Sequence, residues 1–146
     1  RLPAGCGRLV RPENLHITLV FLGSVSRNQE QCVVNGAQGI QVTPITLTLD
    51  TLDWWQRPQV LWLGSKLSPA SLTLLAEELK ALAHHCGIRT DARPFAPHAT
   101  LARKVDRRVA LTISTPVTWP ISAFALVRSE TRPEGPRYEV IWTSTG

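Results

Sequence analysis

The 146-residue chain contains no methionine and no apolar run long enough to cross a membrane. A membrane-spanning helix needs about 20 consecutive apolar residues, so we expect no membrane association. The first eleven residues lack the apolar stretch of a secretory signal peptide. We therefore expect a cytoplasmic protein. Because no initiator methionine is present, we also expect that residues ahead of Arg1 are missing from this sequence.

Cysteines are few and far apart, at Cys6, Cys32 and Cys86. They form no C-x-x-C pair, the spacing typical of zinc sites and redox motifs. An odd number of widely spaced cysteines does not indicate a disulfide framework either. We expect reduced and mostly buried thiols, and no metal or other cofactor.

Charged residues are moderate at 18% and hydrophobic residues reach 43%, as in an ordinary globular protein. The length suits a single domain, which we expect to cover residues 1–146. Sixteen basic residues against eleven acidic ones give a net charge of +5. This surplus favours an anionic partner without identifying it.

Several segments have the composition of β-strands, being rich in β-branched or alternating apolar residues. These predicted strands cover residues 15–23, 43–53, 59–63, 98–105, 123–130 and 138–142. In residues 43–53, Ile45, Leu47 and Leu49 recur at period two, so one face of this strand should be buried. Trp54 and Trp55 are assigned to the connection that follows it.

Two helices are predicted between these strands. The clearer one has Ser68 as N-cap, Pro69 at its first position and Gly87 at its end. Its apolar face consists of Leu72, Leu75, Leu79, Leu82 and Cys86. Weak 3.6-residue periodicity in residues 25–39 predicts a shorter helix. Strands and helices alternate without a regular βαβ rhythm, which indicates an α+β fold with largely antiparallel sheets.

The main feature is an internal repeat. Residues 11–19 read RPENLHITL and residues 93–101 read RPFAPHATL, so both fit R-P-x-x-x-H-x-T-L. With four histidines in the whole chain, two such matches are far more than composition would produce by chance. The repeat therefore points to a shared function of His16 and His98.

The spacing within each copy has a chemical meaning. Residues i and i+2 of a strand point to the same side, so His16 lies beside Thr18, and His98 beside Thr100. Each copy then offers an imidazole for proton transfer and a hydroxyl for binding an oxygen atom. An unperturbed imidazole titrates near pH 6.5, so one copy can be neutral while the other is protonated. Zinc binding is the competing use, with ligands from His16, His98, His84 and Cys86, but no short-range ligand pair supports it.

The two H-x-T-L tetrapeptides and their surroundings resemble the 2′-5′ RNA ligase-like group of 2H phosphoesterases, in particular the bacterial RNA 2′,3′-cyclic phosphodiesterases. The similar context comprises PENLH before the first motif, VFLG after it, VLWLG at residues 60–64 and RPFAPHATLAR at residues 93–103. The resemblance implies a bilobed α+β fold with pseudo-twofold symmetry, in which the motif strands line a central cleft. Members of the family usually carry a strand and a helix ahead of the first motif, whereas 15 residues precede His16 here.

The resemblance also implies an activity. We expect hydrolysis of a terminal 2′,3′-cyclic phosphate of RNA to a 2′-phosphate, with His98 as proton acceptor and His16 as proton donor. Thr18, Thr100 and Arg103 would bind the phosphate oxygens. Two alternatives remain: the same site acting as a 2′-5′ RNA ligase or on a small cyclic nucleotide, and a non-catalytic RNA-binding module. We infer no obligate protein partner.

Further residues are candidates for contacts with RNA. Aromatic side chains can stack on bases and arginines can bind backbone phosphates. The candidates for these two roles are Trp54, Trp55 and Tyr138, and Arg57, Arg107 and Arg108. Trp62 and Trp142 lie within predicted strands and are assigned to the core.

Overall fold

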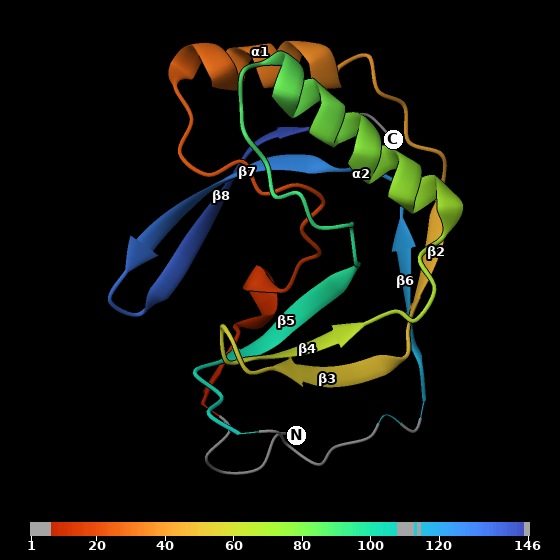
Figure 1. Ribbon diagram of the computed structural model, residues 1–146, viewed down its shortest axis with the longest axis vertical. Helices are drawn as coiled ribbons and strands as arrows, with labels where there is room; N and C mark the ends of the chain where they lie inside the picture. Colours follow the sequence, from red (N-terminus) through yellow and green to blue (C-terminus); the bar gives the residue numbers. More distant parts are fainter. Residues whose placement is uncertain (1–6, 108–112, 114, 145–146) are drawn as a thin grey trace. The chain divides into compact units, whose positions relative to one another are not determined.

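The structure is a computed structural model that describes residues 7–107, 113 and 115–144 (Figure 1). The chain divides into two compact units, each built from three separate segments. Unit 1 comprises Arg1–Thr18, Leu47–Ser68 and Ala96–Trp119, and unit 2 comprises Leu19–Thr46, Pro69–Phe95 and Pro120–Gly146. Among the described residues, no helix combines the length and the hydropathy that crossing a bilayer requires.

A four-stranded sheet forms the centre of unit 1. Its strands are β1 (Arg8–Leu9), β5 (His98–Arg103), β4 (Val60–Gly64) and β3 (Thr51–Trp55), in this spatial order and with antiparallel neighbours. The strands predicted over residues 59–63 and 98–105 are thus confirmed. The prediction that Trp54 and Trp55 belong to a connection is wrong, because both lie in β3.

One face of this sheet is apolar. Leu61, Ala102 and Val105 form a buried cluster, and Leu52 and Trp54 pack against it. The indole of Trp54 is fixed there, since its Nε1 donates a hydrogen bond of 2.8 Å to the Val105 carbonyl. By strand alternation, the opposite face carries His98 and Thr100 on β5 and Trp62 on β4.

The pairing of β4 with β5 contains a β-bulge. Trp62 lies opposite Thr100, but the neighbouring Leu61 lies opposite Ala102, so Leu101 is the extra residue on β5. A bulge shifts the alternation of the strand by one residue. Ala102 therefore faces the apolar cluster, and Arg103 comes to the same face as His98.

Two further strands pair with each other, β2 (Ile45–Leu49) and β6 (Val117–Ile121). In β2 the expected alternation is confirmed, because Ile45, Leu47 and Leu49 are buried while the threonines between them are exposed. Strand β6 was not predicted. Its sequence VTWPI contains a proline, which lacks the amide hydrogen that a central strand needs and so lowers the strand signal.

Unit 2 contains helix α1 (Arg27–Ala37), helix α2 (Ala70–His85) and a hairpin of β7 (Ala125–Arg132) and β8 (Gly135–Thr143). Both predicted helices and both late strands are confirmed. Helix α1 begins with a capping box, in which Ser26 and Gln29 hydrogen-bond each other's backbone amides. The N-cap of α2 is Pro69, so the prediction that Ser68 caps this helix is wrong.

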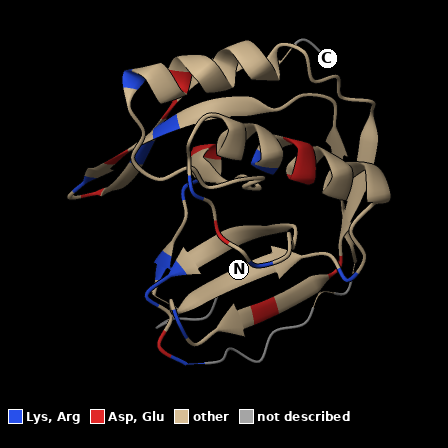
Figure 2. Ribbon diagram, turned by 45° about the horizontal axis from the view of Figure 1, so that its top comes forward, with Lys and Arg blue, Asp and Glu red and all other residues tan. Residues whose placement is uncertain are grey.

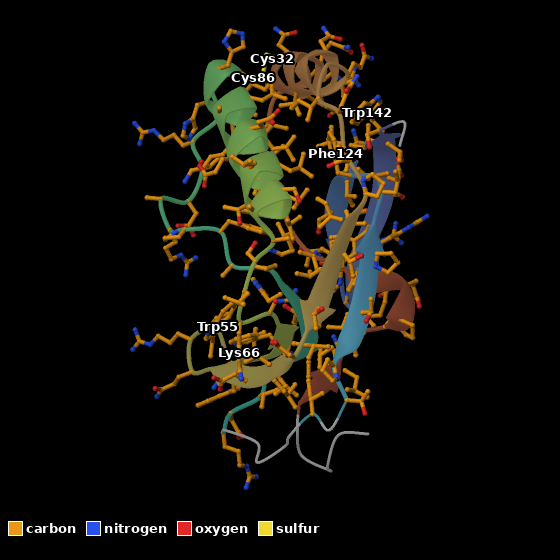
Figure 3. The ribbon with its side chains drawn as sticks, turned by 90° about the vertical axis from the view of Figure 1, so that its right-hand side faces the viewer. Cys32, Trp55, Lys66, Cys86, Phe124 and Trp142 are labelled. Atoms are coloured by element: carbon orange, nitrogen blue, oxygen red, sulfur yellow. A yellow bond between two sulfur atoms is a disulfide. The ribbon has the colours of Figure 1, made fainter. Side chains whose placement is uncertain are left out.

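The two helices of unit 2 are joined covalently. Cys32 of α1 and Cys86 at the end of α2 form a disulfide bond (Figure 3). The prediction of reduced thiols at these positions is therefore wrong. The two cysteines are 54 residues apart and meet because the helices pack together. Their spacing in the sequence alone does not reveal this bond. Close packing is visible one turn along, where a Cβ at Gly36 would overlap the side chain of Leu82.

The strand predicted over residues 15–23 is not formed. The segment has a single isolated bridge, between Ile17 and Ala99, and is otherwise irregular. Its apolar residues are used differently along its length. Leu22 packs on the cluster of Val33, Ala83 and Ile88 in unit 2, whereas Phe21 is exposed. The prediction is wrong because an apolar connecting segment gives the same sequence signal as a strand.

Candidate active site

His98 begins strand β5, and its ring is oriented by the main chain. The Nδ1 atom lies 2.8 Å from the carbonyl oxygen of Ala96, two residues earlier. A carbonyl oxygen can only accept, so Nδ1 carries the hydrogen and donates it. In the neutral ring the lone pair is then on Nε2, which forms no hydrogen bond with a described residue. In this tautomer, Nε2 of His98 is the ring nitrogen that can accept a proton.

His16 is oriented in the same way from a different local structure. A short 3₁₀ turn, η1 (Pro12–Asn14), precedes it and directs the Asn14 carbonyl toward its ring. The Nδ1 atom donates a hydrogen bond of 2.7 Å to this carbonyl. Its Nε2 lies 3.1 Å from the Thr18 hydroxyl, which confirms that positions i and i+2 of the motif lie side by side.

The isolated bridge brings the two motifs together within unit 1. Ile17 pairs antiparallel with Ala99. Continued by one residue in each direction, this register places His16 opposite Thr100 and Thr18 opposite His98. All four side chains then share the face opposite to that of Ile17 and Ala99. Diagonal positions of such a pair lie about 7–8 Å apart, a separation that leaves room for one phosphate between the imidazoles.

A second consequence of the sheet concerns two arginines. Arg103 reaches the face of His98 because of the bulge at Leu101, and Arg8 on β1 lies directly opposite it. Both are exposed, and neither forms an ion pair with another described residue. Like charges opposite each other destabilise a sheet unless an anion compensates them. Figure 2 shows basic residues gathered at this end of the sheet. Sequence reasoning missed Arg8, whose place depends on pairing with a distant strand.

Tryptophans form the wall of the site next to His98. The Trp55 ring lies 4.7 Å from the His98 ring, centroid to centroid, in an edge-to-face arrangement. Trp62 lies 6.2 Å from His98 and 4.9 Å from Trp55. The prediction of Trp62 as a core residue therefore holds in part, since it is half-buried but lies on the site face. The same holds for Trp142, which packs on Phe124 in unit 2 but is half-buried (Figure 3).

Other candidates from the sequence are not part of this arrangement. Trp54 lies on the opposite face of the sheet, and Arg107 is near Asp106, at 3.6 Å. Arg57 is exposed in the turn after β3, Tyr138 belongs to β8 in unit 2, and Arg108 lies outside the described residues.

The zinc alternative loses one proposed ligand, because the sulfur of Cys86 is bonded to Cys32. His84 of α2 hydrogen-bonds Thr90 through Nε2 at 2.8 Å. Within the part of the chain that the structure describes, no three or more histidine, cysteine, aspartate or glutamate side chains gather in a way that could hold a metal ion.

Arg93, the arginine that opens the second repeat, is paired with a carboxylate. The Arg93 guanidinium hydrogen-bonds and forms an ion pair with Asp91 in unit 2. These bonds lower the pKa of the Asp91 carboxyl to about 2. They also raise the pKa of Arg93. The occurrence of R-P in both repeats therefore does not by itself make Arg93 a phosphate ligand.

Comparisons with known proteins identify relatives of this chain. The family model of the 2′-5′ RNA ligase superfamily matches residues 3–133. An RNA 2′,3′-cyclic phosphodiesterase of Escherichia coli is 42% identical over 114 residues, covering 78% of this chain and 64% of the relative. The chain thus spans less than two thirds of that protein. A Thermus thermophilus protein of the same name is 34% identical over 146 residues, covering 90% and 72% of the two chains.

A solved structure of a related protein has a similar fold. The crystal structure of E. coli LigT complexed with 3′-AMP has a TM-score of 0.85 and 37% sequence identity. The alignment covers 99% of this chain and 85% of that one. The α+β fold of the phosphoesterase type that the sequence predicts is thereby confirmed.

Proposed function

The chain belongs to the 2′-5′ RNA ligase superfamily, and on this premise we propose that it hydrolyses the 2′,3′-cyclic phosphate at the end of an RNA. The observation that carries the proposal is the antiparallel register of the two H-x-T-L segments about Ile17 and Ala99. It puts two imidazoles, each with Nδ1 bound to the main chain, on one face of unit 1. Relatives from E. coli and T. thermophilus named RNA 2′,3′-cyclic phosphodiesterase support the choice of reaction.

In the proposed mechanism, His98 accepts a proton from the attacking water through Nε2. The water oxygen bonds to phosphorus while the bond from phosphorus to the ribose 3′ oxygen breaks. His16, protonated, donates the hydrogen on Nε2 to that leaving oxygen, which gives a 2′-phosphate and a free 3′ hydroxyl. Because one ring must be neutral and the other protonated, activity has a bell-shaped dependence on pH.

Three side chains are proposed to bind the phosphate. Thr18 and Thr100 lie in the register next to the imidazoles, and their hydroxyls donate hydrogen bonds to the non-bridging oxygens. Arg103 neutralises the negative charge that grows on these oxygens in the transition state. Arg8, opposite Arg103, is placed to bind a neighbouring phosphate of the RNA backbone.

The substrate is proposed to be RNA, as in the named relatives. That E. coli LigT forms a complex with 3′-AMP supports a nucleoside phosphate as the bound group. The cytoplasmic location expected from the sequence stays a prediction. The disulfide between Cys32 and Cys86 argues the other way, because such bonds are rare in a reducing cytosol.

The decisive assay uses an oligoribonucleotide that ends in a 2′,3′-cyclic phosphate, with excess EDTA present. We expect a product whose phosphate becomes sensitive to phosphatase and which co-migrates with an authentic 2′-phosphate standard. The double variant His16→Ala/His98→Ala, purified in parallel, controls for contaminating nucleases. Activity that disappears with EDTA, or a 3′-phosphate product, would contradict the mechanism.

The family's description makes 2′-5′ RNA ligation the second candidate. It would use the same imidazoles, with a ribose 5′ hydroxyl in place of water. Incubation with two oligonucleotides, one ending in a cyclic phosphate and one in a 5′ hydroxyl, measures ligation beside hydrolysis. Salt-dependent binding of RNA without either product would instead indicate a binding module.

A further inference from the structure

Two arginines lie side by side at one end of the site face of unit 1. Strand β1 pairs with β5 so that Arg8 is opposite Arg103 and Leu9 is opposite Ala102. Residues directly opposite each other on antiparallel strands point to the same face, with Cβ atoms about 4.5–5.5 Å apart. Ala102 faces the apolar cluster, so both arginines point to the face that carries His98.

The backbone holds Arg8 close to the end of β5. Gly7, which precedes it, has a φ of +71°, and a Cβ there would lie 2.2 Å from the Arg103 carbonyl oxygen and 2.7 Å from that of Lys104. A larger residue would push β1 away. Within the described ranges, the non-glycine residues with positive φ are Lys104 at +57° and Gln59 at +66°, whose carbonyl accepts the amide after Lys104 at 2.9 Å. Such residues are uncommon and cluster at functional sites.

The charge of this arginine pair is not neutralised by the protein residues that the structure describes. Arg8 and Arg103 are exposed, and no ion pair joins either of them to a residue in the described ranges. Asp106, the acidic residue nearest to Arg103 in sequence, lies 3.6 Å from Arg107 instead. Basic residues gather at this end of the sheet (Figure 2). The planar guanidinium group suits phosphate, which it can bind with two hydrogen bonds.

A single cyclic phosphate cannot balance both arginines. Arg103 lies three residues beyond Thr100 on β5, a rise of about 10 Å at about 3.3 Å per residue, so a long side chain is needed to reach back to the reacting phosphate. That phosphate is a diester with one negative charge, which leaves the charge of Arg8 unbalanced. An RNA end supplies a second charge nearby, on the diester that joins the terminal nucleotide to the one before it. A mononucleoside cyclic phosphate lacks this group.

We propose that Arg8 binds the phosphodiester on the 5′ side of the terminal nucleotide and so makes the protein select polynucleotide ends over mononucleoside cyclic phosphates. The inference rests on the proposed function and deepens it, because it separates an enzyme of RNA ends from one of small cyclic nucleotides. It also requires that the selection depend on the charge of this linkage.

The test compares three substrates that share a terminal 2′,3′-cyclic phosphate. They are adenosine 2′,3′-cyclic phosphate, the dinucleotide ApA ending in this group, and the same dinucleotide with an uncharged methylphosphonate between its nucleosides. For the unaltered protein we expect kcat/KM to be about tenfold higher for the charged dinucleotide than for the other two, as for one hydrogen bond between charged groups. Arg8→Gln should remove most of this preference, and Arg8→Lys, which keeps the charge, should retain part of it.

The matched control is Arg89→Gln, which removes the same charge from an exposed position in unit 2 and should leave the preference unchanged. Salt dependence gives a second readout that a general loss of activity would not move. For the charged dinucleotide, the slope of log(kcat/KM) against the logarithm of salt concentration should become shallower by about 0.7 in Arg8→Gln, since one contact to a single-stranded phosphate is lost.

The outcomes separate this phosphate contact from other roles. Equal kcat/KM for the charged and the methylphosphonate dinucleotide in the unaltered protein would refute the contact, while the proposed function stands. A preference that persists in folded Arg8→Gln, or an equal loss of kcat/KM for all three substrates, would refute it as well. Failure to hydrolyse these substrates and the cyclic-phosphate oligonucleotide would refute the proposed function itself.

Discussion

The two copies of R-P-x-x-x-H-x-T-L share their sequence pattern but not their secondary structure. His98 starts a strand inside a four-stranded sheet and touches two indoles. His16 follows a 3₁₀ turn and belongs to a segment with one isolated bridge. Nevertheless both rings donate from Nδ1 to the carbonyl two residues earlier, at 2.7 Å and 2.8 Å. The motif therefore determines the orientation of the imidazole, and the surroundings determine what lies beside it.

This difference bears on the assignment of roles. His98 has Nε2 without a described partner and an aromatic wall next to it. His16 has Nε2 near the Thr18 hydroxyl and is exposed. Because the two similar sequences lie in different surroundings, we expect the same substitution to have different effects in the two copies. The following experiments test that comparison.

The largest effect is expected from removing either imidazole. His16→Ala and His98→Ala should each lower the turnover of the cyclic-phosphate oligonucleotide by about 10²–10⁴-fold, since each removes the proposed acid or base. A substrate with sulfur in place of the bridging 3′ oxygen separates the roles, because its leaving group needs no proton. Activity of His16→Ala should largely recover with this substrate, whereas that of His98→Ala should not. The reverse pattern would exchange the two assignments.

A somewhat smaller effect is expected at Arg103, the residue that the first motif lacks. The position five residues after His16 is Phe21. Arg103→Gln should lower kcat by about 10²-fold, as for loss of a group that stabilises transition-state charge. The adjacent Lys104→Gln serves as control and should change kcat little. Equal losses of kcat in Arg103→Gln and Lys104→Gln would mean that catalysis depends on the total positive charge and not on the side chain on the site face.

The aromatic wall of the second motif depends on Gly64. In Gly64→Ala the new methyl group must displace the Trp62 ring or the Pro97 carbonyl. We expect kcat/KM to fall roughly tenfold, because overpacking forces neighbouring side chains to shift. The control is Gly39→Ala, where the nearest atom, the Gly36 oxygen, would lie 3.7 Å from the new Cβ. Thermal unfolding of both variants shows whether the loss of kcat/KM is confined to the site or comes with a loss of overall stability. An unchanged rate in folded Gly64→Ala would show that the wall does not support catalysis.

The smallest effect concerns Arg93, the arginine that opens the second repeat. Arg93 is paired with Asp91, whose pKa is lowered to about 2 from an ordinary 3.8. A lowered carboxyl pKa stabilises the fold above pH 3.8, and this contribution is lost as the pH falls through about 2. Since the pair is exposed, Asp91→Asn should change stability and activity little at neutral pH. An NMR titration of the Asp91 carboxyl with a midpoint near 4 would contradict the pairing.

Much of the fold was predictable because its signals are local. The alternation of Ile45, Leu47 and Leu49 gave the buried face of β2, and the spacing of leucines gave α2. The pairing of Cys32 with Cys86, by contrast, depends on the packing of helices far apart in sequence. The apolar segment after His16 has the composition of a strand, yet it forms one isolated bridge, with Leu22 packed on the cluster of unit 2 and Phe21 exposed.

The residues of the candidate site also divide into those with a local sequence signal and those without one. His16, Thr18, His98 and Thr100 followed from the repeat, and the register about Ile17 and Ala99 explains why the repeat matters. Strict alternation would put Arg103 on the face opposite to His98, so its place could not be derived from spacing without the bulge at Leu101. The neighbours of His98 were hidden as well. Trp55, Trp62 and Gly64 belong to strands whose order across the sheet no short motif encodes.

The main-chain anchoring of both rings has a consequence for protein engineering. Many catalytic histidines are held by a separate carboxylate, which must be imported from elsewhere in the fold. Here each ring is held by a peptide carbonyl of its own segment, two residues upstream. A short peptide can therefore carry its own ring orientation into another antiparallel scaffold. Two such grafts in opposite directions would be a minimal starting point for building a phosphodiesterase into a new protein.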